Sequence, residues 1–180
     1  MCGILGSIGQ FNNINNNSFH QALLKSNFRG PDYSNSHNFI SSNNQIFLGH
    51  NRLSIIDLNP TGNQPKESRS KNNMIIFNGE IYNHLELRKK FPSDFAWTSN
   101  SDTETLIELI EKFGTIKTLS LIRGMFAFAV YDFKKDVVTL ARDISGEKPL
   151  YLYFHEKGFI FSSDLNSPSH LGMPSKEIDQ

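Results

Sequence analysis

A cysteine stands at the second position of the chain, directly after Met1. An initiator methionine is ordinarily removed when the next residue is small, and its removal would give Cys2 a free α-amine beside its thiol. Reference pKa values are about 7.7–8.0 for such an amine and about 8.5 for a thiol, so the amine can take the thiol proton near neutral pH. A nucleophile with an adjacent base suits acyl transfer. Taken alone, Met-Cys more often marks only a small residue that opens a buried strand.

The dipeptide Asn78-Gly79 follows a short apolar segment at residues 74–77. The Asn78 side-chain amide and the Gly79 N–H can both point at one oxygen, which is the pair of donors that an oxyanion hole requires. Glycine also lets the backbone approach a ligand without a Cβ clash. The same dipeptide is a strong signal for a hairpin turn, and both interpretations stay open at this point.

Three charged residues have the chemistry to hold an amino acid. Arg52 precedes the apolar run Leu53-Ser54-Ile55-Ile56, and an arginine fixed by apolar neighbours suits bidentate capture of a carboxylate. Asp102 lies in the first turn of an expected helix, where the helix dipole favours an acid. Together, Arg52 can hold an α-carboxylate, while Glu80 and Asp102 hold the α-ammonium. Taken singly, an ion pair or a helix-end preference explains each of them as well.

The elements that must position these residues are strands and helices in alternating groups. Helices are expected from Ser18, as the capping residue, to about residue 27, at 83–91, from the capping box Ser101-Asp102-Thr103-Glu104 to Gly114, and at 117–122. Apolar segments predict strands at residues 2–9, 46–50, 74–77, 125–132, 137–142, 150–154 and 159–162. Two batches of strands with helices grouped between them indicate an α+β fold with antiparallel sheets.

Composition excludes several classes of protein. The chain has 180 residues with 18 basic and 18 acidic side chains, and this zero net charge argues against a nucleic-acid binder. The longest apolar run, at residues 125–130, is far too short for a membrane span, and the N-terminus lacks the pattern of a signal peptide. One cysteine forms no internal disulfide, which fits a reducing cytoplasm. The six histidines lack ligand-like spacing, so no metal site is expected.

With these residues in place, the chain resembles the class II glutamine amidotransferase domain of glutamine-hydrolysing asparagine synthetases. Nine stretches match in the family's order and span residues 2 to about 165. They are Cys2-Gly3-Ile4, Arg29-Gly30-Pro31-Asp32, Gly49-His50-Asn51-Arg52-Leu53-Ser54-Ile55-Ile56-Asp57-Leu58, Gly62-Asn63-Gln64-Pro65, Phe77-Asn78-Gly79-Glu80-Ile81-Tyr82-Asn83, Ser101-Asp102-Thr103-Glu104, Gly124-Met125-Phe126-Ala127-Phe128-Ala129, Ala141-Arg142-Asp143 and Gly146-Glu147-Lys148-Pro149-Leu150-Tyr151.

The resemblance implies a four-layer αββα sandwich, the N-terminal-nucleophile hydrolase fold, with two antiparallel sheets between helical layers. It implies an amidotransferase domain at residues 1–165. Cys2 would attack the side-chain amide of L-glutamine, with its own α-amine as base, and Asn78 and Gly79 would stabilise the oxyanion. Ammonia would leave, and water would then hydrolyse the glutamyl thioester.

The resemblance also implies a set of substrate contacts. Arg52 would bind the glutamine carboxylate, and Glu80 and Asp102 its ammonium. The stretch from Arg29 to Asp32 would be structural, as would His50. The backbone groups that would line the glutamine pocket belong to Leu53, Ser54, Ile55 and Ile56.

Full members of this family continue into a synthetase domain that binds ATP and magnesium and activates the ammonia acceptor. Its Ser-Gly-Gly-containing loop is absent from this sequence. We therefore expect no cofactor in this chain, and a synthetase domain or subunit as its partner. Residues 166–180 read as a tail or a truncated linker. The acceptor, aspartate or a sugar carboxylate, and assembly as a homodimer stay open, with a cytoplasmic location expected.

Two alternatives compete with this interpretation. One is the amidotransferase domain of a purine- or hexosamine-pathway synthase, but Arg-Leu-Ser-Ile-Ile-Asp and Asn-Gly-Glu-Ile-Tyr-Asn favour the asparagine-synthetase branch. The other is a catalytically silent module that binds glutamine or regulates a separate synthetase. The presence of every expected catalytic residue argues against that second alternative.

Overall fold

The computed structural model describes residues 1–91 and 95–172 and divides them into two compact units. The first unit combines residues 1–53 with the segment that starts at residue 149, and the second comprises residues 54–148. Each unit has its own antiparallel sheet and its own apolar core. No helix within the described residues is both long and apolar enough to cross a membrane.

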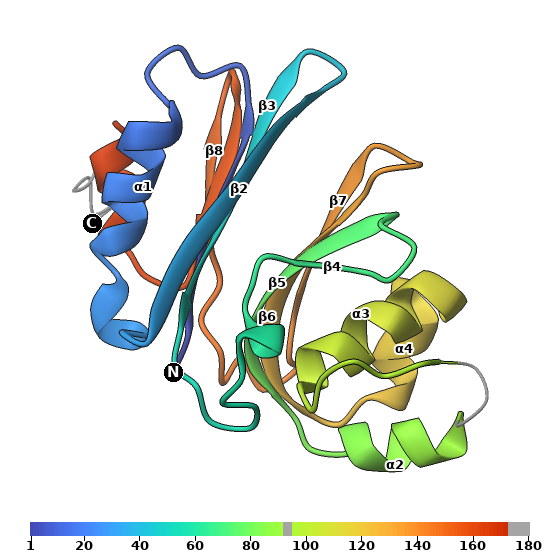
Figure 1. Cartoon of the computed structure of the whole chain (residues 1–180). Helices are drawn as coiled ribbons and strands as arrows, with labels where there is room; N and C mark the ends of the chain where they lie inside the picture. The colour runs from blue at the N-terminus through green and yellow to red at the C-terminus, as the bar shows by residue number, and fades with distance from the viewer. Residues whose placement is uncertain (92–94, 173–180) are drawn as a thin grey trace. The chain divides into compact units, whose positions relative to one another are not determined.

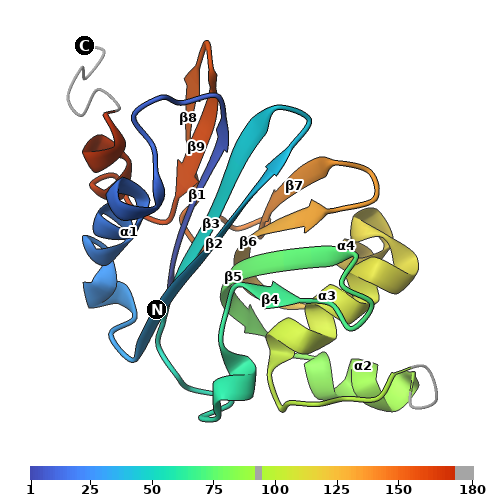
Figure 2. The same cartoon turned by 45° about the horizontal axis from the view of Figure 1, so that its top comes forward.

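The first unit is built on a five-stranded sheet in the order β2-β3-β1-β9-β8, so that β1 is its central strand (Figures 1 and 2). Helix α1 lies against one face, and Phe19 and Leu23 from this helix share a buried cluster with Leu171. The elements are β1 (Gly3–Gly9), α1 (Asn16–Leu24), η1 (Asn27–Arg29), β2 (Tyr33–Ser41), β3 (Asn44–Arg52), β8 (Tyr151–His155), β9 (Gly158–Ser162) and η3 (Ser167–Leu171).

Glycine in the central strand makes room for aromatic side chains. Gly6 of β1 pairs with Phe161 of β9, and a Cβ on Gly6 would overlap the Phe161 ring. Phe161 is fully buried. The predicted buried strand at the N-terminus is therefore confirmed, and its small residues admit large neighbours.

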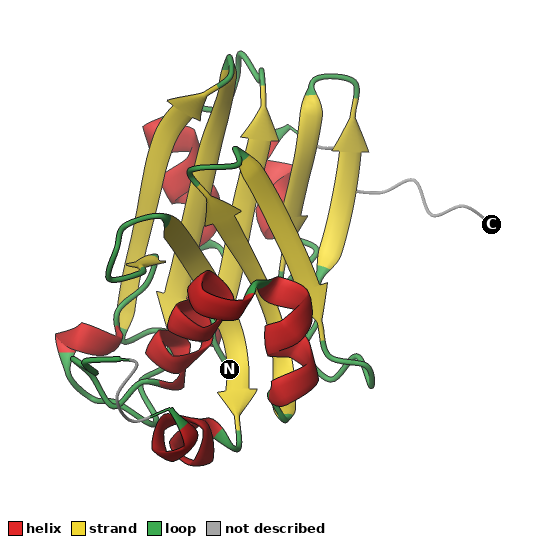
Figure 3. Cartoon of the chain, turned by 90° about the vertical axis from the view of Figure 1, so that its right-hand side faces the viewer, coloured by secondary structure: helices red, strands yellow, loops and turns green. Residues whose placement is uncertain are grey.

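The second unit is built on a four-stranded sheet in the order β4-β5-β6-β7. Helices α3 and α4 lie against one face of this sheet (Figures 2 and 3). Leu106 and Ile110 of α3 join Ile75 and Phe77 of β5 in its core. The elements are η2 (Pro60–Gly62), β4 (Lys66–Glu67), β5 (Asn73–Ile81), α2 (His84–Lys90), α3 (Asp102–Phe113), α4 (Thr115–Leu121), β6 (Gly124–Asp132) and β7 (Val137–Arg142).

Two local expectations in the first unit are wrong. Asn15, not Ser18, caps α1: its side chain accepts from the N–H groups of Asn17 and Ser18, each at 3.0 Å, and the Ser18 hydroxyl accepts from Asn15 N–H. The helix ends at Leu24, short of the expected residue 27, and residues 27–29 form the separate 3₁₀ turn η1. Strand β2 was not predicted, because polar residues occupy most of both its faces and none of its residues is buried.

Two expectations in the second unit also need correction. Asn78-Gly79 is not a hairpin turn, since both residues lie inside β5 and pair with β6. Ser101 caps α3 by accepting from Thr103 N–H at 3.1 Å. Its expected partner in the capping box, Glu104, instead accepts hydrogen bonds from Thr98 and Ser99.

The domain boundary expected at residue 165 remains a prediction. The segment beyond it begins with η3, in which Leu171 is 1% exposed. The rest of the expected tail, residues 173–180, lies outside the described residues.

Candidate active site

The Cys2 thiol lies beside the backbone of Leu53 in the first unit. Leu53 N–H donates to Cys2 Sγ over 3.4 Å, and the thiol contacts the Leu53 carbonyl oxygen over 3.8 Å. Arg29 Nε donates to the Cys2 carbonyl oxygen over 3.1 Å. Both the backbone and the side chain of Cys2 are therefore held in place.

The Arg29-to-Asp32 turn also contacts Arg52, the residue predicted to bind the substrate carboxylate. Asp32 N–H donates to the Arg52 carbonyl oxygen over 3.0 Å, and a Cβ on Gly30 would overlap the backbone of Arg52. Arg52 ends β3 and is 7% exposed. The sequence predicted a structural role for this turn. Its hydrogen bonds with the backbones of Cys2 and Arg52 show which residues it holds in place.

In the second unit, Asn78 lies on β5 and is 1% exposed. Within residues 1–91 and 95–172, neither the oxygen nor the nitrogen of its side-chain amide has a hydrogen-bond partner. A buried polar group without a partner costs about 1–3 kcal/mol. Such groups are rare in folded proteins and call for an explanation, such as a ligand.

The edge of β5 exposes a second donor beside Asn78. Phe77 N–H donates to Gln64 Oε1 over 2.6 Å, and Ile81 N–H donates to Asp102 Oδ2 over 2.9 Å. Alternate N–H groups of a strand point to the same edge, so Gly79 N–H points this way between the other two. Strand β4 does not reach it, because β4 pairs only with Met74 and Ile75. The two donors proposed for an oxyanion hole are thus adjacent on β5.

Gly79 is also the residue that this part of the strand requires. It pairs with Phe126 of β6. A Cβ at this position would overlap the Met125 carbonyl oxygen and the Phe126 backbone. Any larger residue would force β5 away from β6.

A buried carboxyl lies next to these donors. Asp102 is the first residue of α3 and is 5% exposed. Burial raises its pKa from 3.8 to about 6, and the nearby charge of Glu80 adds to the rise, while the hydrogen bond from Ile81 N–H opposes it. The second unit therefore groups two hydrogen-bond donors and two acids within β5 and the start of α3.

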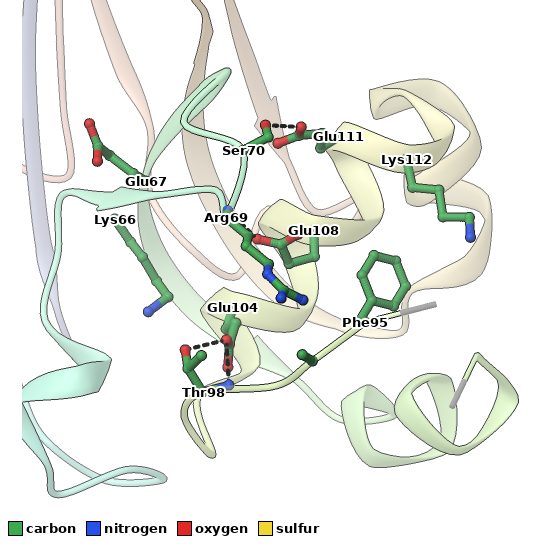
Figure 4. Close-up of a pocket in the computed structure, with 11 residues that line it drawn as sticks. Lys66, Glu67, Arg69, Ser70, Phe95, Thr98, Glu104, Glu108, Glu111 and Lys112 are labelled. Carbon is green, nitrogen blue, oxygen red and sulfur yellow. Dashed lines mark hydrogen bonds between the residues drawn. The ribbon is translucent and has the colours of Figure 1, made fainter. Parts of the chain in front are cut away.

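A hollow of the same unit, of about 690 Å³, is lined by acidic and basic side chains of α3 and the β4 segment (Figure 4). Its three carboxylates on α3 are engaged. Glu104 accepts from Thr98, Glu108 from Arg69 N–H over 2.7 Å, and Glu111 from Ser70. These bonds tie neighbouring segments to α3, so the carboxylates are structural. Among the described residues, no group of three or more His, Cys, Asp or Glu could hold a metal ion.

Comparison with known proteins identifies the family. A family model described as a glutamine amidotransferase domain matches residues 1–180. The chain belongs to this family. The amidotransferase domain is 40% identical over 133 residues to asparagine synthetase B (glutamine-hydrolyzing) of Escherichia coli, covering 74% of this chain and 23% of the relative. It is 35% identical over 173 residues to asparagine synthetase (glutamine-hydrolyzing) 2 of Arabidopsis thaliana, covering 94% of this chain and 28% of the relative. The chain thus spans about a quarter of these relatives.

A solved structure confirms the fold. Glutamine phosphoribosylpyrophosphate amidotransferase from Bacillus subtilis, complexed with ADP and GMP, matches with a TM-score of 0.77 at 19% identity. The match covers 96% of this chain and 44% of that protein. The expected α+β class with two antiparallel sheets and the N-terminal-nucleophile hydrolase fold are therefore confirmed, and so is the resemblance to the class II amidotransferase domain.

The predicted site residues of the amidotransferase domain fall into two groups. Cys2, Arg52 and Leu53 lie in the first unit, where Cys2 contacts Leu53. Ser54 opens the second unit, and the neighbouring Ile55 is 70% exposed. The members of the second group are Ser54, Ile55, Ile56, Asn78, Gly79, Glu80 and Asp102. His50 is fully buried.

Proposed function

We propose that this amidotransferase domain hydrolyses the side-chain amide of L-glutamine and releases ammonia. The observation that carries the proposal is the buried Asn78 amide, which has no hydrogen-bond partner among the described residues, beside the outward N–H of Gly79. Two donors of this kind stabilise the negative oxygen of a tetrahedral intermediate, and removing one such donor typically lowers kcat by about 10²–10³-fold. A glutamine amide oxygen would supply the acceptor that Asn78 Nδ2 does not find in the described part of the chain.

Cys2 is the proposed nucleophile. Once Met1 has been removed, the α-amine of Cys2 takes the thiol proton and Sγ attacks the amide carbon of glutamine. The carbonyl oxygen becomes an oxyanion that accepts from Asn78 Nδ2 and Gly79 N–H. The C–N bond then breaks, the proton passes to the leaving nitrogen, and ammonia departs. Water hydrolyses the resulting thioester, which gives glutamate and regenerates the thiol.

Charged groups hold the two ends of the substrate in this proposal. Arg52 pairs with the glutamine carboxylate, for which a guanidinium is suited by its paired donors. Glu80 and Asp102 accept from the ammonium. Leu53, Ser54, Ile55 and Ile56 contribute backbone groups to the pocket.

The released ammonia would serve an ATP-dependent amidation, because the relatives described above are named asparagine synthetases. We assign that step, with ATP and magnesium, to a synthetase domain or subunit. Aspartate is the acceptor that those names suggest, and a sugar carboxylate is the alternative. A reducing compartment keeps the single cysteine as a thiol, so the cytoplasm is the proposed location.

Intact-protein mass spectrometry with an electrophilic glutamine analogue tests the proposal. We expect a mass without Met1, one covalent adduct, protection by glutamine, and no adduct on C2A. Glutamate and ammonia release is measured on the same samples. Absence of both labelling and turnover in protein that has lost Met1 would contradict the proposed hydrolysis. Glutamine binding without turnover would instead identify a silent module.

A further inference from the structure

The stretch Gly62-Asn63-Gln64-Pro65 has no role in the proposed reaction, yet its glutamine is buried. Gln64 is 5% exposed, and its side-chain amide makes two hydrogen bonds. Its Oε1 accepts from Phe77 N–H over 2.6 Å, and its Nε2 donates to Thr103 Oγ1 over 3.2 Å. The amide thereby joins a strand backbone to a helix side chain.

Both partners of Gln64 are immediate neighbours of proposed site residues. Phe77 directly precedes Asn78 on β5, and Thr103 directly follows Asp102 in the first turn of α3. One buried amide therefore connects the strand that carries the oxyanion donors to the helix end that carries the ammonium-binding acid. Building on the proposed function, we propose that Gln64 is a positioning residue that sets the spacing between the Asn78-Gly79 donor pair and the Asp102 carboxyl.

The edge of β5 shows why a side chain, rather than a strand, performs this task. An extended β4 would pair with the outward N–H groups of Phe77, Gly79 and Ile81 in turn. In the structure β4 has two residues, and Gln64 and Asp102 each take one of those N–H groups. Within residues 1–91 and 95–172, neither β4 nor these two side chains take the Gly79 N–H between them, so it is left for a ligand. Gln64 thus fixes β5 and also keeps the oxyanion donor open.

The chemistry of the side chain is specific to glutamine. The Phe77 N–H requires an acceptor, which is Gln64 Oε1, and Thr103 Oγ1 accepts from a donor, which is Gln64 Nε2. Methionine has a similar length but neither group, so Q64M removes both bonds with little change in volume. T103V keeps the Phe77 bond and removes only the connection to α3, and T103S retains a hydroxyl as the conservative variant.

A matched control is available at the other end of the same two elements. Asn73 of β5 is 6% exposed, and its side-chain amide donates to Glu111 of α3 over 3.4 Å. N73L therefore removes a buried amide contact between β5 and α3 that lies away from the proposed site. It reports what loss of packing alone does to catalysis.

The test is the split between kcat and KM for glutamine hydrolysis in the full chain, together with the thermal midpoint of each variant. We expect Q64M to lower kcat/KM about 10–100-fold through both parameters, since small misplacements of reacting groups cost this much. T103V should raise KM with kcat within about threefold, T103S should restore KM, and N73L should change neither parameter. If Q64M and T103V behave like N73L while the wild type is active, the inference fails and the proposed function stands. If the wild type neither turns over glutamine nor labels at Cys2, both fail. If Q64M does not fold, the T103V and T103S pair decides.

Discussion

Ile81 N–H donates to the Asp102 carboxylate over 2.9 Å and so joins the end of β5 to the first residue of α3. The bond only partly offsets the burial of the carboxyl, whose pKa is raised to about 6. Asp102 is thus ionised near neutral pH, and burial of its charge lowers the stability of the folded protein.

The raised pKa predicts how glutamine binding depends on pH. Protonation of Asp102 removes one of the two negative charges proposed to face the substrate ammonium. We expect the apparent KM for glutamine to rise as pH falls through about 6, with kcat less affected. Initial-rate kinetics from pH 5 to 8 measure this, and D102N should have a high KM at every pH. A wild-type KM that is flat across this range would remove Asp102 from the ammonium site.

The raised pKa of Asp102 also predicts that D102N, although it impairs glutamine binding, stabilises the folded protein at neutral pH. Folding raises the pKa of Asp102 from 3.8 to about 6. Above pH 6 the carboxyl is ionised in both states, and burial of its charge destabilises the folded state. Below pH 3.8 the carboxyl is neutral in both states, and this destabilisation disappears. D102N should therefore be more stable than the wild type at pH 7.5, by up to about 3 kcal/mol. The gap should close near pH 4. Urea unfolding at the two pH values measures it, and a gap that widens in acid would contradict the assignment.

Asn78 should likewise be important for activity but not for stability. N78A removes a proposed oxyanion donor together with a buried amide that has no partner among the described residues. We expect kcat to fall about 10²–10³-fold while KM changes little and the thermal midpoint is kept or raised. Stopped assays and differential scanning calorimetry give both numbers. A variant with normal kcat would show that Asn78 does not contact the reacting oxygen.

Gly6 provides a prediction about packing alone. A Cβ at this position overlaps the Phe161 ring, and overpacking of a core typically costs about 1–3 kcal/mol. G6A should lose stability in this range, and the double variant with F161L should recover part of it. In the same strand, a Cβ on Gly3 would lie 3.2 Å from Ser26 Oγ, so G3A serves as the milder control. Equal losses for G6A and G3A would contradict this account.

Local patterns predicted the elements whose signal lies within the element itself. The apolar spacing of α3 and the run of β6 each marked a buried face. Asn78-Gly79 was open to two interpretations because a dipeptide signal is local, whereas the pairing of Gly79 with Phe126 is long-range. Strand β2 was not predicted because none of its residues is buried, so its sequence carries no apolar alternation. The role inferred for Gln64 depends on partners 13 and 39 residues away, which spacing alone does not reveal.

The central place of β1 affects how the chain is made. Ile4 N–H donates to Ser163 Oγ over 3.0 Å, and Ser163 N–H donates to the Ile4 carbonyl oxygen over 2.9 Å, across 159 residues of sequence. β1 emerges first from the ribosome, but β9, its neighbour on one side, follows only after about 150 further residues. At typical rates of about 5–20 residues per second, the strand after Cys2 waits about 8–30 seconds for that partner. The central strand that follows the proposed nucleophile therefore gains its β9 neighbour only when synthesis of the domain is nearly complete, whereas the residues that contact Cys2 itself, Arg29 and Leu53, are made much earlier.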